Sequence, residues 1–213
     1  MSKLGDVATK AILKEIEQIL LKEVFYPVLL GKLSKKDRRG IKCCSMFLKK
    51  KYKAGGRFDK VEVRLVAGGH LRDRTMYGDK LSSPTVEISS VFMIGVIAAA
   101  EGRKVVTLDI SGAYLHAKMP TDCAVYMRLN KYLSTIMIQL SNHYAKYLND
   151  DGKIVVRLDK ALFECVQSSK LWYDRLCEVL YEMGYAVNDE DKCCFNKMVS
   201  SNQITICVDV DDL

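Results

Sequence analysis

Apolar residues recur at helical spacing in three stretches of the chain. The helices that this pattern predicts cover residues 6–25, 86–101 and 169–183. Ile12 and Ile16 lie on one face of the first helix, which we expect to end before Pro27. The second helix contains the longest apolar run of the chain and is therefore expected to be buried. The third lies between Ser168, a candidate N-cap, and Gly184, which favours a stop.

Shorter runs rich in apolar and β-branched residues alternate with these helices. The strands that they predict cover residues 45–52, 61–67, 104–110, 125–129, 154–158, 194–198 and 204–208. Gly55 and Gly56 join the first two strands, which is a typical hairpin signal. Residues 35–39 are predicted to form a basic loop, and residues 130–152 show no clear period. Because paired strands alternate with helices, the pattern indicates an α+β fold.

Composition and length narrow the class of protein. The 213 residues are 49% hydrophobic and include three prolines, which is typical of a folded globular chain. The longest apolar run is well short of the roughly 20 residues that span a bilayer, so no membrane partner is expected. No secretory signal is visible, and we therefore expect an intracellular protein. The eight cysteines contain no Cys-x-x-Cys pair and are expected to be reduced, mostly buried thiols.

The net charge of +7 is unevenly distributed along the chain. Residues 1–80 hold 20 Lys and Arg against 9 Asp and Glu, a net charge of +11. Residues 81–213 hold 13 against 17, a net charge of −4. A basic half beside an acidic half is typical of a protein that holds nucleic acid next to a metal-binding region. A solvated basic surface without a ligand explains the first half equally well.

Two of the predicted strands lead to carboxylates. Residues 204–208 precede Asp211 and Asp212, and residues 104–110 carry Asp109, 102 residues upstream of Asp211. Neighbouring carboxylates repel each other unless a cation lies between them, and divalent metals are the usual occupants. The three aspartates therefore predict a two-metal site of the kind that catalyses nucleotidyl transfer. The alternative is that they are an exposed turn pair and a strand-end residue.

Eight short blocks form an ordered series along the chain. They are RLVAGG at 64–69, SPTV at 83–86, LDISGAYL at 108–115, VYM at 125–127, KALF at 160–163, QS at 167–168, LWY at 171–173 and VDDL at 210–213. Each block is weakly specific alone. Together, in this order and from about residue 8 to the end, they resemble the reverse transcriptase of copia-type retrotransposons.

The resemblance implies a reverse-transcriptase-like fold with fingers and an incomplete palm. Residues 1–29 would be an N-terminal helix and lead-in, residues 30–82 a basic fingers hairpin region, and residues 83–213 a palm that ends at the Asp-Asp motif. The thumb and RNase H domains would be absent. The implied activity is RNA-directed DNA polymerisation, with an RNA or DNA template-primer and deoxynucleoside triphosphates as partners. The implied location is the cytoplasm or a virus-like particle.

The same resemblance assigns roles to individual side chains. The three aspartates would be the catalytic, metal-binding carboxylates for two Mg²⁺ ions, with Mn²⁺ as the alternative. Arg64 would grip the triphosphate, Tyr114 would pack against the sugar and exclude a ribose 2′ hydroxyl, and Gln167 would line the nucleotide pocket. Each of these three also has a plain structural interpretation. Arg64 could form a surface ion pair, Tyr114 could pack in the core, and Gln167 could be a surface residue at a helix start.

Four positions depart from the family pattern. Glu62 stands where the family usually has a lysine directed at the triphosphate, and Asp209 where an aromatic residue usually precedes the acidic pair. Glu164 replaces a glycine, and Ser169 replaces a proline. Two unit charges 4 Å apart interact by about 1 kcal/mol in water and about 4 kcal/mol at an effective dielectric of 20. We therefore expect weak triphosphate binding and no polymerase activity of the isolated chain.

Two alternatives to a polymerase stay open at this point. The chain could be a non-catalytic nucleic-acid-binding protein that uses the basic fingers, which predicts salt-sensitive binding independent of the aspartates. It could also be a decayed copy without a selected role. That second alternative predicts a partly unfolded, aggregation-prone chain with an open sheet edge.

Overall fold

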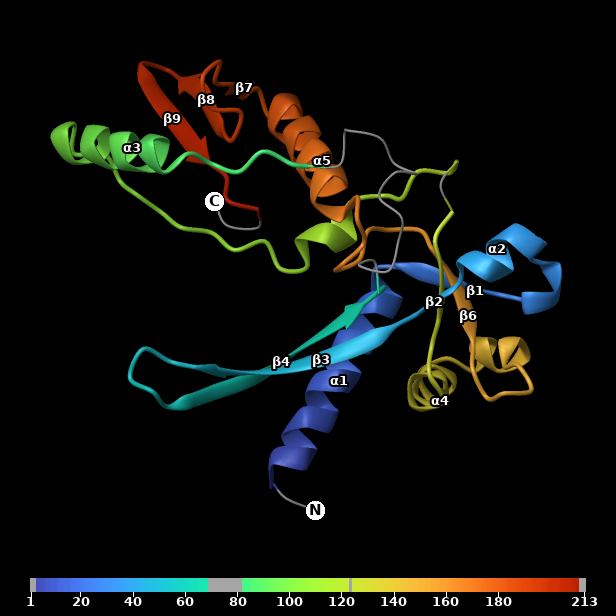
Figure 1. The fold of residues 1–213 in the computed structure, drawn as a ribbon. Coiled ribbons are helices and arrows are strands. Elements are labelled where there is room, and N and C mark those ends of the chain that lie inside the picture. The colour runs from blue at the N-terminus through green and yellow to red at the C-terminus, as the bar shows by residue number, and fades with distance from the viewer. Residues whose placement is uncertain (1–2, 69–81, 123, 211–213) are drawn as a thin grey trace. The chain divides into compact units, whose positions relative to one another are not determined.

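The chain divides into two compact units that each combine helices and strands (Figure 1). A computed structural model describes residues 3–68, 82–122 and 124–210. The first unit joins residues 1–76 to residues 114–168, and the second joins residues 77–113 to residues 169–213. The predicted α+β class is confirmed. The fingers and palm boundaries after residues 29 and 82 stay predictions.

A four-stranded sheet forms the centre of the first unit. Its strands, in order across the sheet, are β1 (Phe25–Val28), β6 (Val155–Leu158), β5 (Tyr126–Arg128) and β2 (Lys42–Cys43). β6 pairs antiparallel with both neighbours, and β2 joins β5 in parallel. Val155 and Val156 are both fully buried, although successive side chains of a strand point to opposite faces. Both faces of β6 are therefore covered, and the predictions of strands over 125–129 and 154–158 are confirmed.

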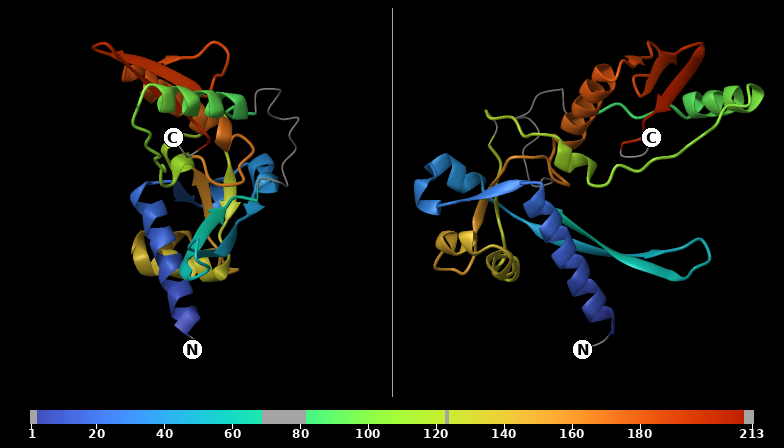
Figure 2. Two further views of the ribbon diagram at one scale, coloured as in Figure 1. Left: turned by 90° about the vertical axis from the view of Figure 1, so that its left-hand side faces the viewer. Right: turned by 180° about the vertical axis from the view of Figure 1, so that it is seen from behind.

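A long antiparallel hairpin and an N-terminal helix complete the frame of this unit (Figure 2). The elements are α1 (Lys3–Leu21), β3 (Ser45–Tyr52) and β4 (Phe58–Val66). α1 packs against β4. Val63 and Leu65 of β4 are buried, whereas Glu62 and Arg64 lie on its opposite face, half-buried and exposed respectively. The hairpin predicted from the paired glycines is confirmed, and it presents Glu62 and Arg64 side by side.

The first helix ends earlier than predicted. α1 stops at Leu21, and Glu23 has a φ of 51°, a left-handed conformation that breaks a helix. Pro27, expected only to mark the helix end, lies inside β1. β1 is an edge strand, and proline is tolerated there because its missing N–H removes no essential ladder bond.

Several short helices were not predicted from the sequence. They are α2 (Lys35–Gly40), α4 (Lys131–Leu140) and the 3-10 turns η1 (Leu30–Lys32), η4 (Ala113–His116) and η5 (Asn142–Tyr147). Ser34 caps α2 by accepting from the Asp37 N–H at 3.1 Å, so the prediction of a loop over 35–39 was wrong. Asn130 caps α4 in the same way, through the Leu133 N–H at 2.9 Å.

Within its described residues, the second unit contains two helices and a three-stranded antiparallel sheet. Its elements are α3 (Ile88–Ala100), α5 (Ser168–Glu182), β7 (Ala186–Val187), β8 (Cys194–Val199) and β9 (Asn202–Cys207). The strand order is β7-β8-β9. Phe195 of β8 is fully buried and contacts Tyr181 of α5, with ring centroids 6.2 Å apart. The helix predicted over 169–183 and the two strands predicted near the C-terminus are confirmed.

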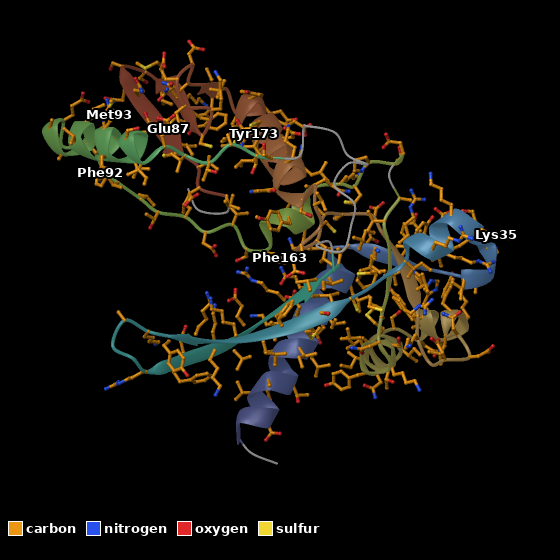
Figure 3. The ribbon with its side chains drawn as sticks, viewed as in Figure 1. Lys35, Glu87, Phe92, Met93, Phe163 and Tyr173 are labelled. Carbon is orange, nitrogen blue, oxygen red and sulfur yellow. The ribbon has the colours of Figure 1, made fainter. Side chains whose placement is uncertain are left out.

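Helix α3 forms as predicted, but its predicted burial is wrong. Of its described side chains only Ala98 is buried, whereas Phe92 is 70% exposed and Val96 69% exposed. Figure 3 shows Phe92 and Met93 on the surface of the helix. A helix that is apolar all round is normally buried. The apolar run therefore predicted the helix correctly, but it carried no information about what covers it.

The strand predicted over residues 104–110 does not form. This segment is extended and exposed, and only Asp109 takes part in an isolated bridge. Val105, Val106 and Leu108 are all more than half exposed. The prediction of a strand here was wrong, because no ladder forms over this segment among the described residues.

Asp191 links the loop before β8 to the start of α3. Its carboxylate accepts from the Glu87 N–H at 3.0 Å and from the Cys193 N–H at 2.8 Å. Burial acts to raise the pKa of Asp191, but the Ser90 hydroxyl and these two N–H groups outweigh it, so the pKa lies below its usual value. Glu87 provides no side-chain cap for α3. Asp191 thus satisfies donors at this helix N-terminus from 104 residues away.

Asp191→Asn is expected to lower the free energy of unfolding at neutral pH by about 1–3 kcal/mol, because the amide cannot accept at both positions. Since the folded pKa of Asp191 is below the unfolded value, the contribution is present above about pH 4 and is lost as the pH falls through the folded pKa. Thermal unfolding at each pH, followed by the fluorescence of Trp172, the single tryptophan, measures this loss of stability. A difference between variant and wild type that stays constant down to pH 2 would contradict it.

The cysteines behave as predicted where the structure describes them. Five of the seven described cysteines are buried: Cys44, Cys165, Cys177, Cys193 and Cys194. Burial raises the pKa of Cys44 to about 11 and that of Cys194 to about 12, so both stay protonated at neutral pH. Among the described residues, no helix is both long and apolar enough to cross a bilayer.

Candidate functional site

Arg64 is the centre of a charged cluster on the exposed face of the hairpin. Its Nη2 and Nε donate to Glu62 Oε1 at 2.9 and 3.3 Å, and Lys51 Nζ lies 3.2 Å from the other carboxylate oxygen. Partial burial acts to raise the pKa of Glu62, but the hydrogen bonds from Arg64 and Lys51 hold it below its usual value. Glu62 is therefore ionised at neutral pH and occupies the guanidinium edge.

The flat face of Arg64 lies over an aromatic ring. Its Cζ atom is 4.6 Å from the centroid of Phe163, which Figure 3 labels. The Phe163 backbone is fixed against the end of β4, where the Ala67 N–H donates to its carbonyl oxygen at 3.2 Å. A guanidinium stacks favourably on an aromatic face. The ring thus holds Arg64 in one orientation.

Tyr114 contacts the same ring from another side. The Tyr114 and Phe163 centroids are 5.0 Å apart with an interplanar angle of 77°, an edge-to-face geometry. Arg64 and Tyr114, which are 50 residues apart, therefore meet around Phe163. The side chains that the sequence assigned to the triphosphate and the sugar belong to one cluster.

A second carboxylate lies behind this cluster, on α1. Glu15 Oε1 accepts from the Leu65 N–H at 3.4 Å. Burial raises the pKa of Glu15, although the Leu65 N–H and the nearby charge of Arg64 act in the opposite direction. Arg64 thus has two acidic neighbours, one of which is paired directly.

Gln167 is 6% exposed, so its interpretation as a surface residue at a helix start is wrong. Its Nε2 lies 3.9 Å from Met119 Sδ, and its buried Oε1 has no hydrogen-bond partner among the described residues. An unpaired buried acceptor costs about 1–3 kcal/mol.

Only one of the three predicted metal-binding carboxylates lies among the described residues. Asp109 is an exposed residue of the second unit, and Asp211 and Asp212 lie outside the described residues. Val210 has a φ of 58°, a strained conformation for a β-branched residue, and its carbonyl oxygen accepts from Trp172 Nε1 at 2.5 Å. Such strain is typical of functional turns. Residues 3–68, 82–122 and 124–210 contain no group of three or more metal-ligating side chains.

Two neighbours of the predicted nucleotide-binding residues were missed by the sequence analysis. Phe163 belongs to the KALF block but received no role, because a single phenylalanine after an alanine and a leucine reads as core. Met119 carried no signal at all. The contact of Arg64 with Phe163 depends on a parallel bridge between Val66 and Phe163, which no local pattern predicts.

Comparison with known families identifies the class of protein. A profile described as reverse transcriptase (RNA-dependent DNA polymerase) matches residues 30–213. The chain belongs to this family. The resemblance to copia-type retrotransposon reverse transcriptases is also confirmed, because the similar curated proteins are Pol polyproteins of such transposons.

Three relatives show how the chain relates to longer proteins. It is 25% identical to the retrovirus-related Pol polyprotein from transposon TNT 1-94 of Nicotiana tabacum, over 96% of this chain and 14% of the relative. It is 24% identical to the retrovirus-related Pol polyprotein from transposon RE1 of Arabidopsis thaliana, over 80% of this chain and 11% of the relative. It is 26% identical to the transposon Ty1-NL2 Gag-Pol polyprotein of Saccharomyces cerevisiae, over 71% of this chain and 8% of the relative. The chain thus spans 14% or less of these relatives. No solved structure matches it.

Proposed function

We propose that this reverse-transcriptase domain carries a two-metal nucleotidyl-transfer site, with Asp109, Asp211 and Asp212 as the metal-binding carboxylates. The observation that carries the proposal is the cluster around Phe163. Arg64 and Tyr114, which the resemblance assigns to the incoming nucleotide, each contact the Phe163 ring. Ordinary core packing would place Tyr114 against apolar neighbours, but it would not require an arginine on the same ring.

The residues present fit the ligands expected. Mg²⁺ prefers carboxylate oxygens, and Asp109 is exposed and able to provide one. When bound, two such ions activate a primer 3′ hydroxyl and neutralise the leaving pyrophosphate. The Arg64 fork matches phosphate oxygens, and Gln167, whose side-chain oxygen has no partner among the described residues, would line the nucleotide pocket. RNA or DNA template-primer and deoxynucleoside triphosphates are the proposed partners.

We also propose that the isolated chain does not polymerise. Glu62 pairs with the guanidinium edge that a triphosphate would need, so a nucleotide must break this ion pair before it can bind. It must also approach a fixed negative charge. Both effects weaken triphosphate affinity while leaving the cluster folded.

The second candidate is a non-catalytic nucleic-acid-binding domain. The same ion pair favours it, because Arg64 is occupied by Glu62 while the basic surface of residues 1–80 keeps its net charge of +11. This function needs no metal and no nucleotide.

Asp211→Asn separates the two functions. The non-catalytic candidate predicts salt-sensitive binding of single-stranded RNA, by fluorescence anisotropy in EDTA, with an unchanged affinity in the variant. Asp189→Asn, which removes an exposed charge of the second unit, is the matched control. If Asp211→Asn alone abolishes binding in EDTA, the non-catalytic candidate fails. Primer extension by the wild-type chain in Mg²⁺ would overturn the proposed inactivity.

A further inference from the structure

Three lysines and a histidine of the first unit gather where α1 ends. Lys22 follows α1, His116 ends η4, and Lys118 lies opposite Lys160 in an isolated antiparallel bridge. Lys22 Nζ is 2.9 Å from His116 Nε2, and Lys160 Nζ donates to the Lys22 carbonyl oxygen. Side-chain contacts thus join Lys22, His116 and Lys160, and the backbone bridge places Lys118 beside Lys160. We call this group the α1-end cluster.

The bridge brings two of the lysines to the shortest cross-strand spacing. The Met119 and Ala161 N–H groups each donate to the opposite strand at 2.8 Å, on either side of the bridge. Lys118 and Lys160 are thus a non-hydrogen-bonded pair, with Cα atoms about 4.5 Å apart. Their side chains leave the bridge on the same face, and like charges at this position are destabilising.

The histidine does not add a positive charge in this arrangement. An ammonium group can only donate, so Lys22 Nζ is the donor and His116 Nε2 the acceptor. The imidazole is then neutral, with its proton on Nδ1. His116 thereby orients the Lys22 ammonium group.

The lysines of the cluster lack acidic partners. Within residues 3–68, 82–122 and 124–210, Lys22, Lys118 and Lys160 form no ion pair. Their acidic sequence neighbours Glu23 and Asp159 do not pair with them either. Neighbouring lysines without an acidic partner are stabilised by a bound anion.

We infer that the α1-end cluster binds a phosphate group of a nucleic-acid backbone. The lysines supply point charges without a base-reading group, which suits sequence-independent phosphate contact. His116 contributes by positioning Lys22. The inference rests on the proposal that this chain binds nucleic acid, and it assigns part of that binding to residues outside the Arg64 cluster.

The test is the salt dependence of single-stranded RNA binding by the double variant Lys22→Gln/Lys118→Gln. Each phosphate contact on a single strand contributes about 0.7 to the slope of log K against log salt, and the cluster is proposed to hold one phosphate, so the variant should lose about 0.7. The control Lys131→Gln/Lys146→Gln removes the same charge from exposed positions of the first unit outside residues 1–80 and should leave the slope unchanged. Lys118→Gln alone, at an exposed site, should lose about half as much and guards against misfolding of the double variant.

The outcomes are distinguishable. Equal slopes for the double variant, the control and the wild type would overturn the inference while leaving nucleic-acid binding intact. Loss of inorganic tripolyphosphate binding without any change in RNA binding would also overturn it, because the cluster would then hold free phosphate. No RNA binding by the wild-type chain would instead defeat the proposed nucleic-acid binding, and this inference with it.

Discussion

Glu62→Lys is expected to tighten the binding of a deoxynucleoside triphosphate by at least 10-fold. The substitution removes the carboxylate that pairs with Arg64 at 2.9 Å and with Lys51 at 3.2 Å, and so frees both cations. It also turns a repulsion into an attraction. Reversal doubles an interaction of about 1 kcal/mol in water or about 4 kcal/mol at an effective dielectric of 20, which at the upper figure exceeds 1,000-fold.

The measurement is a calorimetric titration of the chain with a deoxynucleoside triphosphate. Asp59→Lys is the matched control, since it makes the same charge change on the same strand, where Asp59 lies 4.0 Å from Lys53. Glu62→Gln should give roughly half of the gain in binding free energy, because it removes the negative charge without adding a positive one. An affinity of Glu62→Lys equal to that of the control would remove Glu62 and its partner Arg64 from the nucleotide pocket.

Phe195→Ala is expected to have the largest effect on stability. Phe195 is completely buried between β8 and α5, and its ring contacts Tyr181. Removing a buried phenylalanine side chain costs about 3–5 kcal/mol through lost burial and the cavity left behind. Because domains are stable by about 5–15 kcal/mol, this is a large fraction of the total.

Urea unfolding followed by Trp172 fluorescence measures this loss, because the indole is buried in the same unit. Val199→Ala, at an exposed position of the same strand, should cost less than about 0.5 kcal/mol. A midpoint for Phe195→Ala that matches that of Val199→Ala would show that the second unit has no fixed core. That outcome would favour a decayed chain without a selected role.

The sequence predicted elements well where periodicity and turn residues agreed. The β3–β4 hairpin follows from alternating residues around Gly55 and Gly56, and α5 follows from its apolar spacing before Gly184. The sequence analysis predicted no helix at α4, although Leu133, Ile136 and Met137 have helical spacing after an Asn130 cap. The sequence therefore contains the signals of helix α4, a capping residue followed by apolar residues at helical spacing.

Other features depend on contacts that no local pattern contains. The apolar alternation at 104–110 is that of a strand, yet a strand needs a partner, and none forms a ladder with this segment among the described residues. The site shows the same limit. Arg64 and Tyr114 were predicted from the family blocks, whereas their meeting at Phe163 depends on a bridge to β4. The Glu62 side chain was expected to repel a nucleotide, and its pairing with Arg64 adds direct competition.

Binding of Mn²⁺, followed by electron paramagnetic resonance, tests the proposed two-metal site most directly. We expect the wild-type chain to bind the ion saturably, and we expect Asp109→Asn and Asp211→Asn each to lose most of that binding. Asp189→Asn should behave as the wild type. The two aspartates are 102 residues apart, so a shared loss would place both at one site. Unchanged Mn²⁺ binding in both variants would contradict the proposed nucleotidyl-transfer site.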